Sequence, residues 1–138
     1  MKACSIPRVI LYILLAILSV NALGAGLLFM IKPDGSLLQI QLDSLSGTPF
    51  RSFLLPGFIL FVFIGVVSFL SFYYLFQGSS ARSKLAVLNI YPKMNLGWTL
   101  ALYTGFSTIC WITIQQIWLD YFWLQSFILM IGILILVC

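Results

Sequence analysis

Side chains suited to acid–base catalysis are scarce in this sequence. It contains no His, and its acidic residues are the three aspartates Asp34, Asp43 and Asp120. General acid–base catalysis relies chiefly on His and on carboxylates of shifted pKa, whereas these aspartates all lie between apolar runs, where a solvated loop charge is the ordinary interpretation. We therefore expect no catalytic residue. An enzyme would require the aspartates to converge, with a metal or a partner protein supplying the missing chemistry.

The three cysteines, Cys4, Cys110 and Cys138, form no reactive or metal-binding pattern. No two are close in sequence, so neither a disulfide framework nor a zinc site is predicted. Cys110 lies inside an apolar run, where cysteine acts as a small packing residue. The apolar runs also lack the carboxylates, His and basic residues that mark proton relays and ion pathways in membranes. We expect no metal, no cofactor and no proton-coupled export.

Uncharged polar side chains inside the apolar runs are the remaining candidates. An amide left unpaired in hydrocarbon costs about 2–7 kcal/mol, so each amide needs a partner. We predict a central polar layer at the depth of Asn21 and Thr108, and an outer layer of Gln115, Gln116 and Gln125. Two interpretations stay open. The layers either close on one another and fix the helix register, or they line a small cavity, capped by the first loop, that binds a lipid headgroup or an uncharged solute.

These residues belong to a chain with the composition of a membrane protein. Of its 138 residues, 62% are apolar and 7% are charged, against about 25% charged in soluble domains. Four apolar runs lie near the length of about 20 residues that spans a bilayer. They predict an all-α fold, an antiparallel bundle of four transmembrane helices that forms a single domain over residues 1–138. The predicted spans are residues 9–31, 53–77, 96–119 and 122–138.

Basic residues predict the orientation of this bundle. Cytoplasmic loops are enriched in Lys and Arg, and only the N-terminus and the second loop carry these residues without acids. They are Lys2, Arg8, Arg82, Lys84 and Lys93. We predict a bacterial cytoplasmic (inner) membrane protein with both termini in the cytoplasm. Aromatic residues near the span ends are typical of the interfacial belt: Trp98, Trp118, Tyr121 and Trp123.

The third apolar run carries the clearest helix-packing pattern. At 100° per residue, six of its residues lie within about 40° of one line, at the spacing of a heptad seam: Gly97, Ala101, Thr104, Thr108, Trp111 and Gln115. Small residues let membrane helices approach closely, and hydroxyls and amides hydrogen-bond across the contact. This face should point into the bundle. The small residues predicted to mediate helix packing are Gly57, Gly65, Gly97, Ala101 and Gly105.

The first loop contains turn and cap signals. Residues 38–42 alternate apolar and polar, which predicts a short strand or a segment lying on the membrane interface. Thr48-Pro49 has the pattern of a helix N-cap followed by proline at the first helical position, so the second helix should begin near Pro49. Pro56-Gly57, one to two turns later, should kink that helix.

Short motifs spread over most of the chain resemble those of small bacterial membrane proteins. They are Thr48-Pro49-Phe50 with Phe53 and Pro56-Gly57, then Gly97-Trp98, and finally Trp123-Leu124-Gln125. In these segments the chain is similar to a loose group of four-span proteins, of no established function, that also carry a Pro-x-Gly turn after the first span. The resemblance implies a four-span topology. It carries no activity and transfers no catalytic residue.

The leading functional prediction is a non-enzymatic accessory or scaffold protein. It would pack against itself as a homo-oligomer, or against a larger membrane protein complex, with membrane lipids around it. The alternative is a lipid- or uncharged-solute-binding or transport protein whose polar cavity opens to the outer side. The two differ in whether the polar seams close on each other or leave a lined cavity. Nucleic-acid binding is not expected, because the basic residues are dispersed and not interleaved with aromatic residues.

Overall fold

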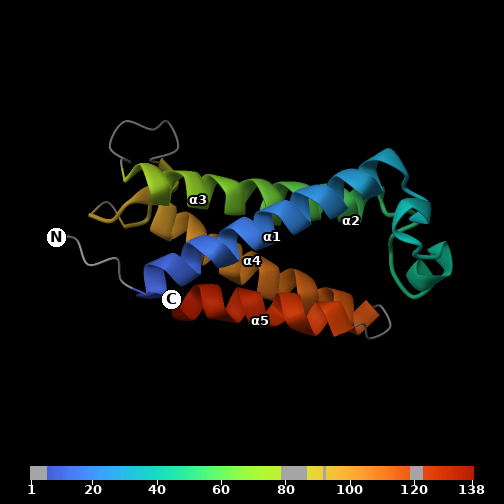
Figure 1. Ribbon diagram of the computed structural model, residues 1–138. Helices are drawn as coiled ribbons and strands as arrows, with labels where there is room; N and C mark the ends of the chain where they lie inside the picture. Colours follow the sequence, from blue (N-terminus) through green and yellow to red (C-terminus); the bar gives the residue numbers. More distant parts are fainter. Residues whose placement is uncertain (1–5, 79–86, 92, 119–122) are drawn as a thin grey trace.

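The computed structural model of this chain describes residues 6–78, 87–91, 93–118 and 123–138, and this described part is helical, without strands (Figure 1). The four long helices are α1 (Ile6–Ile31), a continuous helix from Leu54 to Gln77, α4 (Leu96–Trp118) and α5 (Trp123–Val137). Two short 3-10 turns, η1 (Ser36–Leu38) and η2 (Leu42–Leu45), lie between the first two helices. The predicted all-α class, with four long helices, is confirmed.

The second long helix begins later than predicted and has an irregular centre. It consists of α2 (Leu54–Ile59), the π-helical segment η3 (Leu60–Val66) and α3 (Val67–Gln77). The predicted start near Pro49 is wrong, because the Thr48 hydroxyl accepts a hydrogen bond from the Phe50 N–H at 3.2 Å and donates to the Leu45 carbonyl at 3.0 Å. Thr48 thus closes a turn instead of capping a helix.

Pro56 lies in the first turn of α2. The first four N–H groups of a helix have no partner within the helix, so the missing N–H of Pro56 interrupts no hydrogen bond there. The irregularity of this helix lies further along, in the wider π-helical turn of η3.

The segment over residues 38–42 forms no strand, so that alternative is wrong. Its backbone reverses at Gln39, which has a φ of 55° in the left-handed region, directly after the 3-10 turn η1. The N–H groups of Leu38 and Ile40 both bond to the Gly35 carbonyl at 3.1 Å. The Phe53 N–H bonds to the Pro33 carbonyl at 2.9 Å and closes the whole loop.

The α1 helix packs closely along the second long helix. A Cβ added to Gly26 would lie 2.8 Å from Phe61 Cβ, and one added to Gly65 would lie 2.8 Å from Leu23 Cδ2. Near the start of α1, the Tyr12 hydroxyl donates to a carbonyl of α3 at 3.1 Å. This pair is therefore in contact over most of its length, with the small glycines at the closest points.

The α4 helix is joined to α3 near its start and to α5 along its middle. The Ser71 hydroxyl donates to the Gly97 carbonyl at 2.8 Å, which links α3 to α4. A Cβ added to Gly105 would lie 2.6 Å from Leu136 of α5. The start of α1 and the end of α5 lie at the same end of the molecule as the start of α4, called here the terminal end, and the first loop lies at the opposite, first-loop end (Figure 1). Toward the first-loop end, α1 and α2 diverge from α4 and α5.

Two of these helices are long and apolar enough to cross a membrane: α1, with a mean hydropathy of 2.3, and the helix Leu54–Gln77, with 2.4. The α5 helix is apolar but has only 15 residues, and α4 has 23 residues but a more polar composition. Several residues used for the orientation and the aromatic belt lie outside the described residues: Lys2, Arg82, Lys84, Asp120 and Tyr121. Cys4 lies outside them as well.

Candidate functional site

A cavity of about 510 Å³ occupies the space between the diverging helix pairs. Its floor, toward the terminal end, is formed by Leu18, Ile64, Trp111 and Ile128. Its other walls come from all four long helices, and the first loop covers it with Leu38, Ile40, Leu45, Thr48, Phe50 and Phe53. The volume is that of a pocket for a small molecule, because such pockets measure about 300–1,000 Å³.

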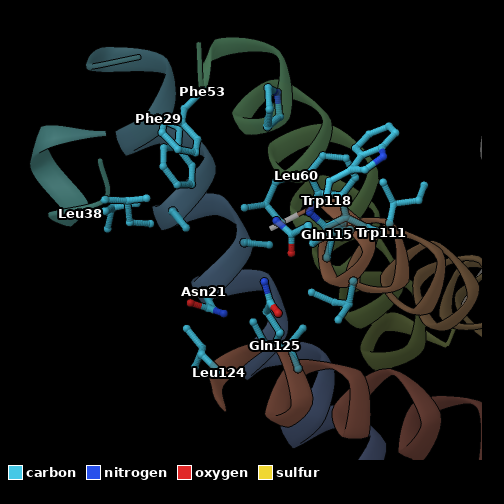
Figure 2. A pocket seen from close by; sticks show the side chains of 18 of the residues that line it. Asn21, Phe29, Leu38, Phe53, Leu60, Trp111, Gln115, Trp118, Leu124 and Gln125 are labelled. Atoms are coloured by element: carbon cyan, nitrogen blue, oxygen red, sulfur yellow. The ribbon is translucent and has the colours of Figure 1, made fainter. Parts of the chain in front are cut away.

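Three amide side chains interrupt this apolar lining. Asn21 comes from α1, Gln115 from α4 and Gln125 from α5, and Figure 2 shows all three directed toward the cavity. Asn21 is exposed, Gln115 is half-buried and Gln125 is buried. Within the described part of the chain, the side chains of Asn21 and Gln115 form no hydrogen bond. The three amides therefore line one cavity.

The other residues of the predicted polar seam lie elsewhere. Thr104 and Thr108 are fully buried between helices, and the Thr108 hydroxyl donates to the Thr104 carbonyl within α4 at 2.7 Å. The Thr104 hydroxyl has no partner among the described residues. Gln116 is half-buried and does not line the cavity. The small residues assigned to helix packing are all buried: Gly57, Gly65, Gly97, Ala101 and Gly105.

Aromatic side chains hold the first loop over the cavity. Phe50 meets Trp118 at the end of α4 edge-to-face, with ring centroids 5.8 Å apart, and Phe53 stacks on Phe29 of α1 at 4.9 Å. Such pairs add about 0.5–1.5 kcal/mol beyond burial of area. The sequence interpretation missed this role, and it assigned Trp118 to the interfacial belt. The available signal was the pair of aromatic residues Phe50 and Phe53 on either side of the polar dipeptide Arg51-Ser52.

The two aspartates that the structure describes are not among the residues that line the cavity. Both Asp34 and Asp43 are exposed in the first loop, and the part of the chain that the structure describes holds no group of three or more His, Cys, Asp or Glu side chains that could bind a metal ion. The backbone N–H of Ser36 donates to Asp34 Oδ1 at 3.1 Å, which lowers the pKa of that carboxyl below its ordinary value. This geometry is that of a charged turn residue.

No charged residue is among the described residues that line the cavity. Its polar groups are neutral amides, the Thr48 hydroxyl and the indoles of Trp111 and Trp118. Amides both donate and accept hydrogen bonds, so they suit hydroxyl, ester or amide groups better than an ion. Burying an unpaired ion among such walls would cost several kcal/mol or more. The cavity therefore matches an uncharged molecule that is mostly apolar.

A second, shallower groove of about 280 Å³ runs along the outside of the bundle between η3 and α4. It is lined by Ile59, Phe63, Ser107 and Cys110, together with three residues that also line the cavity, Ile64, Trp111 and Ile114. Cys110 is exposed along this groove. The described helices therefore leave Cys110 uncovered, so it is not a packing residue between them.

No protein-family model matches this chain, and no curated protein or solved structure is significantly similar to it.

Proposed function

We propose that this protein is an integral membrane protein that binds an uncharged, lipid-like amphiphile. The observation that carries the proposal is the cavity, which combines apolar walls with three amides and, among the described residues, no lining charge. A well-formed apolar pocket with a few convergent polar groups is the usual form of a small-molecule site. The apolar part of the ligand would fill the floor of the cavity, and its neutral polar group would bond to Asn21, Gln115 and Gln125.

The membrane setting of this proposal is a four-span antiparallel bundle in a bacterial inner membrane. Its support is the hydropathy of α1 and of the helix Leu54–Gln77, and the exposure of many large apolar side chains on every long helix. The basic residues Arg8 and Lys93 belong to the terminal end, which favours a cytoplasmic location for both termini. The cavity would then lie in the outer half of the membrane, beneath the first loop.

The amides, more than the apolar walls, would select the ligand. An acyl chain that leaves the bilayer for an apolar cavity exchanges one hydrocarbon environment for another, so little hydrophobic free energy is gained. Each hydrogen bond to an amide contributes about 0.5–1.5 kcal/mol. Three such bonds are enough to distinguish a neutral headgroup with several hydroxyl or carbonyl groups from a plain hydrocarbon.

The accessory-subunit function remains the competing prediction. Exposed apolar side chains such as Phe127 and Met130 of α5 would contact either lipid or a partner helix. In a membrane, lipid and a partner helix are equally apolar surroundings for these side chains, so their exposure does not favour a protein partner. The open cavity does favour a ligand, since two polar seams that closed on each other would leave no lined volume.

A cavity-filling variant tests the proposal. Ala25 lines the cavity, whereas a Cβ added at the neighbouring Gly24 would meet nothing within 4 Å. We expect Ala25→Phe to abolish retention of mono-oleoylglycerol in native mass spectrometry of the detergent-purified protein, and Gly24→Phe to leave it unchanged. Thermal melts confirm that both variants fold. Equal retention by the two variants, or no retention by the unmodified protein, contradicts the proposal.

A further inference from the structure

The wall between the outer groove and the cavity is one layer of side chains thick. Ile64, Trp111 and Ile114 line both spaces. Trp111 is the largest of the three, and it is 8% exposed although it borders two hollows. The position of its indole thus decides whether the groove and the cavity are separate or continuous.

The indole of Trp111 is held by packing alone. Its Nε1 is buried and has no hydrogen-bond partner within the described structure. Leaving a buried donor unsatisfied costs about 1–3 kcal/mol, and buried Trp N–H groups usually have a partner. An unpaired donor in the wall of a cavity therefore suits an acceptor that comes from a ligand.

Each side of the groove is held by close contacts with a neighbouring helix. The η3 side is fixed to α1 by the close contacts of Gly26 with Phe61 and of Gly65 with Leu23. The α4 side is fixed to α5 by Gly105 and Gly132. Between η3 and α4, the shared boundary consists of side chains, and the π-helical turn widens the backbone there. Movement of Trp111 can open this boundary without breaking either helix pair.

From these observations we infer that the groove is a lateral entrance through which an ester-linked monoacyl lipid passes from the bilayer into the cavity, and that Trp111 closes the entrance and donates its indole N–H to the ester carbonyl of the lipid. The inference rests on the proposed function. The N–H is enclosed in the wall, so the lipid reaches it only when the ring turns, and turning the ring is also the movement that opens the wall.

The entrance is tested by the rate at which a lipid enters the cavity. Cys110→Phe places a ring in the groove outside the cavity, and Ile117→Phe adds one at an exposed position of α4 away from both spaces. The probe is a glycerol monoester of dibromostearic acid, whose bromines quench tryptophan fluorescence on arrival. We expect Cys110→Phe to slow the saturable quenching at least about tenfold, with unchanged final occupancy, and Ile117→Phe to have no effect.

The hydrogen bond is tested by the preference of the protein for an ester lipid over the matching ether lipid. The unmodified protein should bind mono-oleoylglycerol about 2–10-fold more tightly than its ether analogue, which lacks the carbonyl. Trp111→Phe should remove that preference and still bind the ether. Trp98→Phe, at the terminal end beneath Arg8, should keep the preference.

The outcomes separate the two proposals. An unmodified protein that binds neither lipid overturns the proposed function and this inference together. A protein that binds both lipids, with equal quenching rates in Cys110→Phe and Ile117→Phe, overturns the entrance alone. A preference for the ester that survives Trp111→Phe overturns the donor role of Trp111.

Discussion

At the scale of single residues, two properties of the Asn21 side chain bear on its role. It is exposed, and it has no hydrogen-bond partner in the described part of the chain. The sequence predicted a paired amide, because an amide in hydrocarbon is costly when unsatisfied. In the proposed setting a ligand supplies the missing partner, and the amide adds nothing to the packing of the helices.

This arrangement predicts that Asn21→Leu changes binding without weakening the fold. The variant loses one hydrogen bond to the ligand, so the Kd for mono-oleoylglycerol should rise about 2–10-fold. Its melting temperature should stay the same or rise, because no internal bond is lost. The measurements are a lipid titration and a thermal melt. Val20→Leu, at the exposed neighbouring position, serves as the control. A lower melting temperature with unchanged binding would assign Asn21 to packing instead.

At the scale of elements, the close approach of α1 to the second helix determines the wall of the cavity. Gly26 lies against Gly57 and Phe61, and this contact positions the first turn of α2 and the start of η3. The Ser68 hydroxyl, at the start of α3, bonds to the Ile64 carbonyl of η3 at 2.5 Å. Leu60 and Ile64, on the segment between these two contacts, line the cavity.

The contact predicts a large difference between two neighbouring glycines. A Cβ at Gly26 would lie 2.8 Å from the Gly57 carbonyl oxygen and from Phe61 Cβ, so Gly26→Ala must push the helices apart. Overpacking of this kind costs about 1–3 kcal/mol. Gly24→Ala meets open space and should stabilise its helix by up to about 1 kcal/mol through helix propensity. Unfolding of both variants in detergent, followed by circular dichroism, measures the difference. Equal stabilities would show that this contact is loose.

Sequence patterns were enough to predict the four long helices, because a long apolar run in lipid must pair its own backbone N–H and C=O groups, and a helix does so. The start of the second helix was misplaced, because the Thr48 side chain bonds within the loop and not to a helix end. The π-helical segment left no signal, since its residues are as apolar as their neighbours. It shifts which side chains face the cavity, so the lining beyond the amides could not be deduced from a regular helical repeat.

Part of the candidate site was therefore within reach of the sequence. Asn21, Gln115 and Gln125 were selected as polar residues in apolar runs, and the structure places them around one cavity. The helical repeat of the third apolar run also separated two adjacent glutamines: it placed Gln115 on the inward face, and Gln115 lines the cavity whereas Gln116 does not. The roles of Phe50, Phe53 and Trp111 depend on contacts between distant segments, which spacing along the chain does not reveal.

At the scale of the whole molecule, the proposed function depends on which end faces outward. Ser36 is exposed in the first loop, and Met94 is exposed before α4 at the terminal end. The proposed topology places Ser36 outside the cell and Met94 in the cytoplasm. We expect a cysteine at Ser36, in a chain whose own three cysteines are replaced by serine, to react with a membrane-impermeant maleimide in intact cells. A cysteine at Met94 should react only after lysis. The reverse pattern would turn the cavity toward the cytoplasmic half of the membrane, and its ligand would then have to come from the inner leaflet.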